Sequence, residues 1–150
     1  MSVQFGVKTI FVAIALILVS GQMRAFADDK PILFEADNAV VNQVDGSLIA
    51  TGNVLLKQGG STVAADEVTY FQQTDRALAR GNVIYTDADG TISRANSMQL
   101  GTEFTHIVAE TLISQFATGE WIAADHADRI VGDKAVFRTS RFTPCKCDFV

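Results

Sequence analysis

A repeat with a period of about 29 residues is the feature that most constrains how this chain can fold. A Gly-Asn-Val marker occurs at Gly52-Asn53-Val54 and again at Gly81-Asn82-Val83, 29 residues later. An alanine followed by Asp or Asn recurs at steps of 29, 30 and 29 residues, at Ala36-Asp37, Ala65-Asp66, Ala95-Asn96 and Ala124-Asp125. Such a period is typical of repeat proteins, in which each unit buries its apolar face against the next. The sequence therefore predicts stacked, similar units.

The segments between the markers have the alternation of apolar and polar residues that is typical of β-strands. Asp45-Gly46, Gly59-Gly60 and Asp89-Gly90 are expected to form hairpin turns, because glycine reaches the positive φ that these turns require. We expect strands at Ser47–Thr51, Asn53–Gln58, Glu67–Gln72, Arg76–Arg80, Asn82–Thr86, His106–Glu110, Leu112–Phe116 and Lys134–Thr139. The predicted fold is all-β, with roughly a dozen short strands and exposed strand edges at both ends of the stack.

Residues 1–27 predict export from the cytoplasm. Lys8 precedes an apolar run from Ile10 to Val19, and the small-residue site Ala25-Phe26-Ala27 follows. This pattern is typical of a secretory signal peptide cleaved after Ala27. A membrane anchor is the alternative, but the run is shorter than the roughly 20 residues needed to cross a bilayer. We expect a mature domain over residues 28–147 and a truncated tail at 148–150.

The charge balance argues against a nucleic-acid partner. The chain has 17 acidic and 12 basic side chains and a net charge of −5. Both basic residues of the signal segment precede the first acid, so residues 28–150 carry a charge of −7. Nucleic-acid binding proteins need a basic surface. The hydrophobic fraction of 48% is sufficient for a packed core.

The sequence offers little for catalysis. His106 and His126 are the only histidines, and neither lies in a recognisable catalytic motif. His106 is expected on the surface and His126 in an exposed turn. Asp87-Ala88-Asp89-Gly90 resembles the start of a calcium loop but lacks the later ligands, so a turn is favoured. We therefore expect no enzyme activity, no metal and no cofactor.

Cys145 and Cys147 are the only cysteines. An exported protein favours disulfide formation. The two residues could pair with each other, stay free, or bond to cysteines of another segment or chain, and the sequence does not decide the connectivity.

The chain resembles the OstA-like, or LPS-transport, family. The resemblance covers about residues 31–147 and is carried by Pro31–Asp37 (PILFEAD), Ala50–Val54 (ATGNV), Ala79–Val83 (ARGNV) and Arg141–Cys145 (RFTPC). The last of these is similar to the end of the N-terminal periplasmic domain of LptD-type LPS-assembly proteins.

This resemblance implies a β-jellyroll, or β-taco, of two folded-over antiparallel sheets at the periplasmic face of the outer membrane of a Gram-negative bacterium. It implies that lipopolysaccharide acyl chains occupy the interior and that an LptA-like bridge protein pairs with an open sheet edge. An LptE-like lipoprotein would be a partner only where a membrane barrel follows. It also implies that the periplasmic cysteines are linked to cysteines of that barrel.

An apolar groove for lipid A acyl chains would be lined by the apolar members of the alternating strands. The candidate lining residues are Leu56, Val68, Tyr70, Leu78, Val83, Tyr85, Met98, Leu100, Ile107, Ile113, Phe116, Trp121, Val136 and Phe137. The alternative is an exported structural β-repeat scaffold whose interior is filled and which binds no lipid. A small secreted hydrolase is disfavoured, because a nucleophile with a nearby base is missing.

Overall fold

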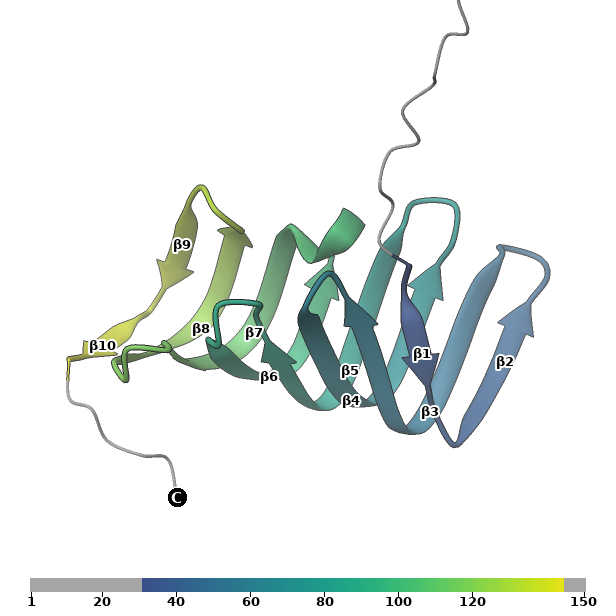
Figure 1. Ribbon diagram of the computed structural model, residues 1–150, viewed down its shortest axis with the longest axis horizontal. Helices are drawn as coiled ribbons and strands as arrows, with labels where there is room; N and C mark the ends of the chain where they lie inside the picture. Colours follow the sequence, from purple (N-terminus) through teal and green to yellow (C-terminus); the bar gives the residue numbers. More distant parts are fainter. Residues whose placement is uncertain (1–30, 145–150) are drawn as a thin grey trace, which may run out of the picture.

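The computed structural model describes residues 31–144, so the predictions for residues 1–27, for Cys145 and Cys147 and for the tail lie outside the described residues. The described part contains strands and one short 3-10 turn (Figure 1). The elements are β1 (Leu33–Glu35), β2 (Asn38–Asn42), β3 (Ser47–Gln58), β4 (Ser61–Phe71), β5 (Arg76–Thr86), β6 (Ile92–Leu100), η1 (Thr102–Phe104), β7 (His106–Gln115), β8 (Trp121–Ile130), β9 (Ala135–Arg138) and β10 (Arg141–Thr143).

All strands belong to one antiparallel sheet. Its order is β1-β3-β4-β5-β6-β7-β8-β10, while β2 also pairs with β3 and β9 also pairs with β8. Each long strand pairs with the next one in the sequence, because short turns join neighbouring strands directly. The predicted glycine turns at Gly59-Gly60 and Asp89-Gly90 join β3 to β4 and β5 to β6. The all-β prediction is confirmed.

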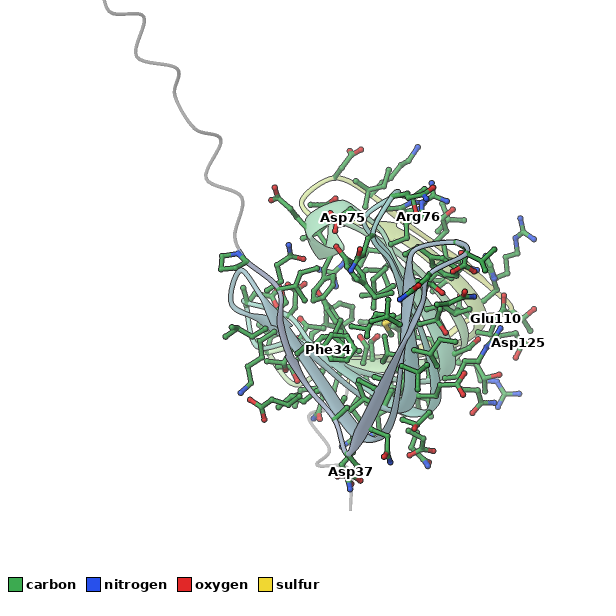
Figure 2. The ribbon with its side chains drawn as sticks, turned by 90° about the vertical axis from the view of Figure 1, so that its right-hand side faces the viewer. Phe34, Asp37, Asp75, Arg76, Glu110 and Asp125 are labelled. Atoms are coloured by element: carbon green, nitrogen blue, oxygen red, sulfur yellow. The ribbon has the colours of Figure 1, made fainter. Side chains whose placement is uncertain are left out.

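The sheet is folded lengthwise into two walls, which Figure 2 shows as two arms that meet near Asp37. Each long strand contributes one half to each wall. The first wall contains β2, β9 and residues 47–51, 67–71, 76–80, 97–100, 106–110 and 126–130. The second wall contains β1, β10 and residues 54–58, 61–65, 83–86, 92–95, 112–115 and 121–124. We call the line where the halves meet the fold line and the opposite side the open side.

The repeat markers form the fold line. The register of β3 with β4 shifts between Thr51 and Val54, and Gly52 and Asn53 have φ values of 79° and 46°. This left-handed backbone suits glycine and is tolerated by asparagine. Asn53 Nδ2 also donates a hydrogen bond to Asp37 Oδ2 at 2.9 Å.

The bend corrects one prediction. The segments Ser47–Thr51 and Asn53–Gln58 were expected to be two strands, but they are the two halves of β3. The same holds for the predicted pairs within β5 and β7. A bend, at Gly52-Asn53, Gly81-Asn82 or Thr111, interrupts the pairing only locally, so the strand continues into the other wall.

The core lies between the walls. Leu56 and Val63 of the second wall and Val68 of the first are fully buried, together with the row of small residues Ala50, Ala79, Ala109 and Ala127. Small side chains on the first wall allow the two walls to approach closely. The outer faces carry most of the charged residues, including the Arg80–Glu67 ion pair at 3.8 Å.

Candidate functional site: the interior between the walls

Most of the predicted lining residues face the interior. In a strand the side chains alternate between faces, and cross-strand partners share a face, so the register assigns each residue to one side. The inward-facing residues are Leu56, Val68, Tyr70, Val83, Tyr85, Met98, Leu100, Ile107 and Phe137, and Phe116 borders an interior cavity from the end of β7.

Leu78 does not face the interior. Its neighbours Ala77 and Ala79 are buried, and its cross-strand partners are Thr69 and Gln99 on the outer face. The prediction was wrong because the interior of this wall is lined by small alanines, whereas we expected large apolar side chains there.

Ile113, Trp121 and Val136 also lie on the outer face. Ile113 pairs with Arg94 and is 38% exposed, and Val136 pairs with Asp128 and is 52% exposed. Trp121 pairs with Gln115, next to the buried Ile122. In β7 the alternation of inward-facing and outward-facing side chains reverses at Thr111, whose φ is 55°. The sequence pattern before Thr111 therefore assigns Ile113 to the wrong face.

An interior cavity of about 160 Å³ lies between the walls in the C-terminal half. The first wall contributes Met98, Ala109 and Phe137, among others, and the second wall contributes Tyr85 and Leu112. Ligand pockets usually measure about 300–1,000 Å³. The cavity therefore holds only part of an acyl chain while the walls stay at this separation.

Polar side chains inside this cavity were missed by sequence reasoning. Ser93 Oγ and Ser114 Oγ lie 2.6 Å apart on the neighbouring strands β6 and β7 of the second wall. Arg129 also lines the cavity, and its Nη2 donates to Asp87 Oδ2 at 2.7 Å. Strand alternation could have shown that both serines face the interior, since each shares a strand face with buried apolar residues. The contact between Arg129 and Asp87 joins residues that are 42 positions apart, so no local sequence pattern predicts it.

Burial changes the acid–base properties of Tyr85, which borders the same cavity. Burial raises the pKa of the Tyr85 phenol to about 12, and the carboxylate of Asp87 acts in the same direction. The hydroxyl donates to Ser61 Oγ at 3.4 Å. Tyr85 is therefore a neutral hydrogen-bond donor across the physiological pH range.

The interior opens at both ends of the stack. Val41 shares its face with the inward-facing Leu48 and Tyr70, yet it is 57% exposed because no strand follows β2 in the described residues. At the other end Phe142 pairs with the buried Ile122 and is 59% exposed. Apolar side chains of the interior thus reach both edges of the sheet.

The histidines pair with acids. His106 Nε2 lies 2.8 Å from Asp128 Oδ1, and His126 Nδ1 lies 2.8 Å from Glu110 Oε1. His106 is exposed, as expected. The prediction that His126 lies in an exposed turn was wrong, because His126 lies within β8. Within residues 31–144, no group of three or more His, Cys, Asp or Glu residues could hold a metal ion.

The Asp87–Gly90 segment is a turn, as the sequence predicted. Asp87 N donates to Thr91 O at 2.9 Å, and Thr91 N donates to Asp89 Oδ1 at 2.8 Å. Hydrogen bonds from the backbone and the side chain of Thr91 to Asp89 hold the pKa of Asp89 below its usual value. Both carboxylates are therefore engaged within the protein.

Residues 34–136 match the family described as the LptA/(LptD N-terminal domain) LPS transport protein. The chain belongs to this LPS-transport family. The LPS-assembly protein LptD of Actinobacillus pleuropneumoniae serotype 5b is 32% identical over 122 residues, which cover 77% of this chain and 15% of that protein. LptD of Burkholderia thailandensis is 29% identical over 119 residues, covering 79% of this chain and 15% of that protein. This chain therefore spans only a small part of the length of these relatives.

The fold agrees with this family. LptH, the LptA-homologous periplasmic component of the lipopolysaccharide transport device from Pseudomonas aeruginosa, superimposes with a TM-score of 0.61 at 18% identity. The match covers 76% of this chain and 93% of LptH. The predicted β-jellyroll fold is confirmed. No helix in the part of the chain that the structure describes is long and apolar enough to cross a membrane.

Proposed function

We propose that this chain acts in lipopolysaccharide transport to the outer membrane, as a non-catalytic conduit whose interior takes lipid A acyl chains. The observation that carries the proposal is the apolar interior that runs the length of the stack and emerges at both ends, at Val41 and Phe142. A closed structural core would bury these side chains, whereas a conduit has to stay open toward its neighbours. Membership of the LPS-transport family supports the same role.

Acyl burial supplies the binding energy in this proposal. Each buried CH₂ group contributes about 0.8 kcal/mol. Residues 28–150 have a charge of −7 and offer little attraction to the phosphates of lipid A, so the headgroup stays outside the walls. Since the cavity of about 160 Å³ is small, the walls must move apart when a chain enters.

The two ends suit an LptA-like bridge protein as partner. The segment β1–β2 runs from the second wall to the first, and β9–β10 runs from the first wall to the second. A similar domain added head to tail would therefore pair antiparallel, with each wall continuing into the matching wall. The exposed apolar residues at the ends would be covered in the same step.

This role places the chain at the periplasmic face of the outer membrane of a Gram-negative bacterium, after removal of the signal peptide. The relatives named LPS-assembly protein LptD are much longer than this chain. An LptE-like lipoprotein belongs to the proposal only for a longer form that carries a barrel.

Site-specific photo-crosslinking in cells tests the conduit. A photoreactive amino acid at Met98 or Phe116, which border the interior cavity, should capture lipopolysaccharide. The adjacent outward position Gln99 and the outer-face residue Leu78 are the matched controls and should give little product. Equal labelling at inner and outer positions would contradict an interior path.

The small cavity favours one rival, an exported structural scaffold with a filled interior. A scaffold would give no lipopolysaccharide adduct at Met98 or Phe116, even while the protein is folded and exported. The crosslinking experiment therefore separates the two functions.

A further inference from the structure

We propose that a latch formed by Arg129, Asp87 and Phe104 closes the open side of the fold, and that its release admits acyl chains sideways between the walls. The inference rests on the proposed function for its ligand, but the latch itself can be measured without any lipid.

The ion pair joins the two walls. Arg129 lies on β8 in the first wall, and its cross-strand neighbour Ile107 is buried in the interior. Asp87 follows β5 at the open side of the second wall. The side chains of Arg129 and Asp87 are only 25% and 7% exposed, and the atoms Nη2 and Oδ2 are 2.7 Å apart. Separation of the walls would break this contact.

Asp87 is held in place by its own wall. Its Oδ1 accepts hydrogen bonds from the backbone N of Ala88 at 2.8 Å and from Ser61 Oγ at 3.4 Å. Ser61 in turn accepts from the Tyr85 hydroxyl. Because Oδ1 is engaged in this way, Oδ2 is directed to Arg129. The carboxylate is therefore preorganised as one half of the latch.

Phe104 provides the apolar half of the latch. It ends the turn η1, which connects β6 and β7 at the open side of the first wall, and it is 3% exposed. A space of about 180 Å³ beside it is bordered by Phe104 and Val131, which follow strands of the first wall, and by Gly59 and Ala88, which follow strands of the second. Phe104 thus approaches the opposite wall and contributes to the shared core.

The backbone at Glu103 and Phe104 has a conformation that is unusual for residues other than glycine. Glu103 and Phe104 have φ values of 53° and 56°. Residues with side chains rarely adopt this left-handed conformation, and it persists only where the surroundings hold it. The turn is therefore an element that can rearrange once its contacts with the second wall are lost.

Hydrogen–deuterium exchange of the full chain tests the latch directly. Arg129→Gln should raise the exchange rate of residues 87–91 and 102–106 roughly tenfold, because a hydrogen bond between charged groups is lost. Arg80→Gln is the matched control, since the Arg80–Glu67 pair lies within the first wall, and it should leave both segments unchanged. Unchanged exchange in Arg129→Gln would overturn the proposal.

Stopped-flow fluorescence with dansyl-undecanoic acid tests the consequence. Arg129→Gln should take up this acyl probe several-fold faster than the parent protein, and Arg80→Gln at the parent rate. If Arg129→Gln does not fold, Phe104→Leu can be used instead, because its smaller side chain reduces the contact with the second wall. The same two measurements then apply to this variant. Faster exchange without any probe or lipopolysaccharide binding in any variant would support the latch and overturn the proposed function. Faster exchange with unchanged uptake by a protein that binds the probe would overturn sideways entry.

Discussion

Asn82 Nδ2 donates a hydrogen bond to Asp66 Oδ2 at 2.8 Å across the fold line. Asn53 makes the same contact with Asp37 one repeat earlier. The two sequence markers of the repeat are thus hydrogen-bond partners, separated by 16 residues in both cases. The repeat therefore encodes the bend that turns one sheet into two walls.

Substitutions of Asn82 can separate the contribution of its hydrogen bond from that of its left-handed backbone conformation. Its φ is 47°, so Asn82→Ala loses the hydrogen bond and also adopts a conformation that alanine disfavours. We expect a loss of about 1–2 kcal/mol in the free energy of unfolding, measured with urea. Asn82→Gly keeps the backbone freedom and should lose less. An equal loss in both variants would show that the left-handed backbone contributes nothing.

Gly81 tests the close approach at the same bend. Its φ is 72°, and a Cβ atom added there would lie 3.0 Å from Asp66 Cβ. Gly132 has a φ of 81°, but an added Cβ would meet nothing within 4 Å. Both alanine variants carry the strain of about 1–2 kcal/mol, and only Gly81→Ala adds the contact with Asp66. Gly81→Ala should therefore have the lower urea midpoint, and equal midpoints would contradict the close approach.

The two tyrosines should ionise late in the folded protein. Burial raises the pKa of Tyr70 to about 12, assisted by its hydrogen bond to Asp75, and burial raises the pKa of Tyr85 to about 12. Tyrosinate absorbance should therefore appear well above the ordinary pKa of about 10, and urea-unfolded protein should titrate near 10. A folded-state midpoint near 10 would contradict the buried environment.

These shifts have a defined effect on stability. The folded-state pKa values are raised, so the neutral phenols contribute stability below pH 10, and this contribution is lost as the pH rises toward 12. Tyr85→Phe should reduce the slope of unfolding free energy against pH in this window, with the slope from Tyr70 remaining. The measurement is urea unfolding at a series of alkaline pH values.

Charges placed at the ends should weaken docking. Val41→Asp and Phe142→Asp each introduce a carboxylate among the inward-facing side chains of one open end. Either change should lower the affinity for an LptA-like protein at least tenfold, provided that its end is used, because a buried unpaired charge is costly. Sedimentation of the mixture measures the association. Ile84→Asp, at an outer-face position that is 38% exposed, is the control and should bind as the parent does. Full binding by both end variants would rule out edge pairing.

The assignment of faces shows how far local patterns extend. The turns at Gly46, Gly60 and Gly90 follow from the sequence, because each needs only a few adjacent residues with a defined backbone. Leu78 was assigned to the wrong face although Arg76 and Arg80 lie on its own face, because a large apolar residue was expected inside and the buried neighbours Ala77 and Ala79 are small. Strand alternation identifies two faces but does not say which one another wall will cover.

The sequence by itself determined the repeat, the all-β class and the hairpin turns at Gly46, Gly60 and Gly90. Glycine and asparagine backbone preferences and hairpin turns act over a few residues, so the chain carries them locally. Only the tertiary structure decided that alanines line the first wall and that Arg129 meets Asp87. These features depend on the distance between two walls, and that distance is set by side chains far apart in the chain packing against one another.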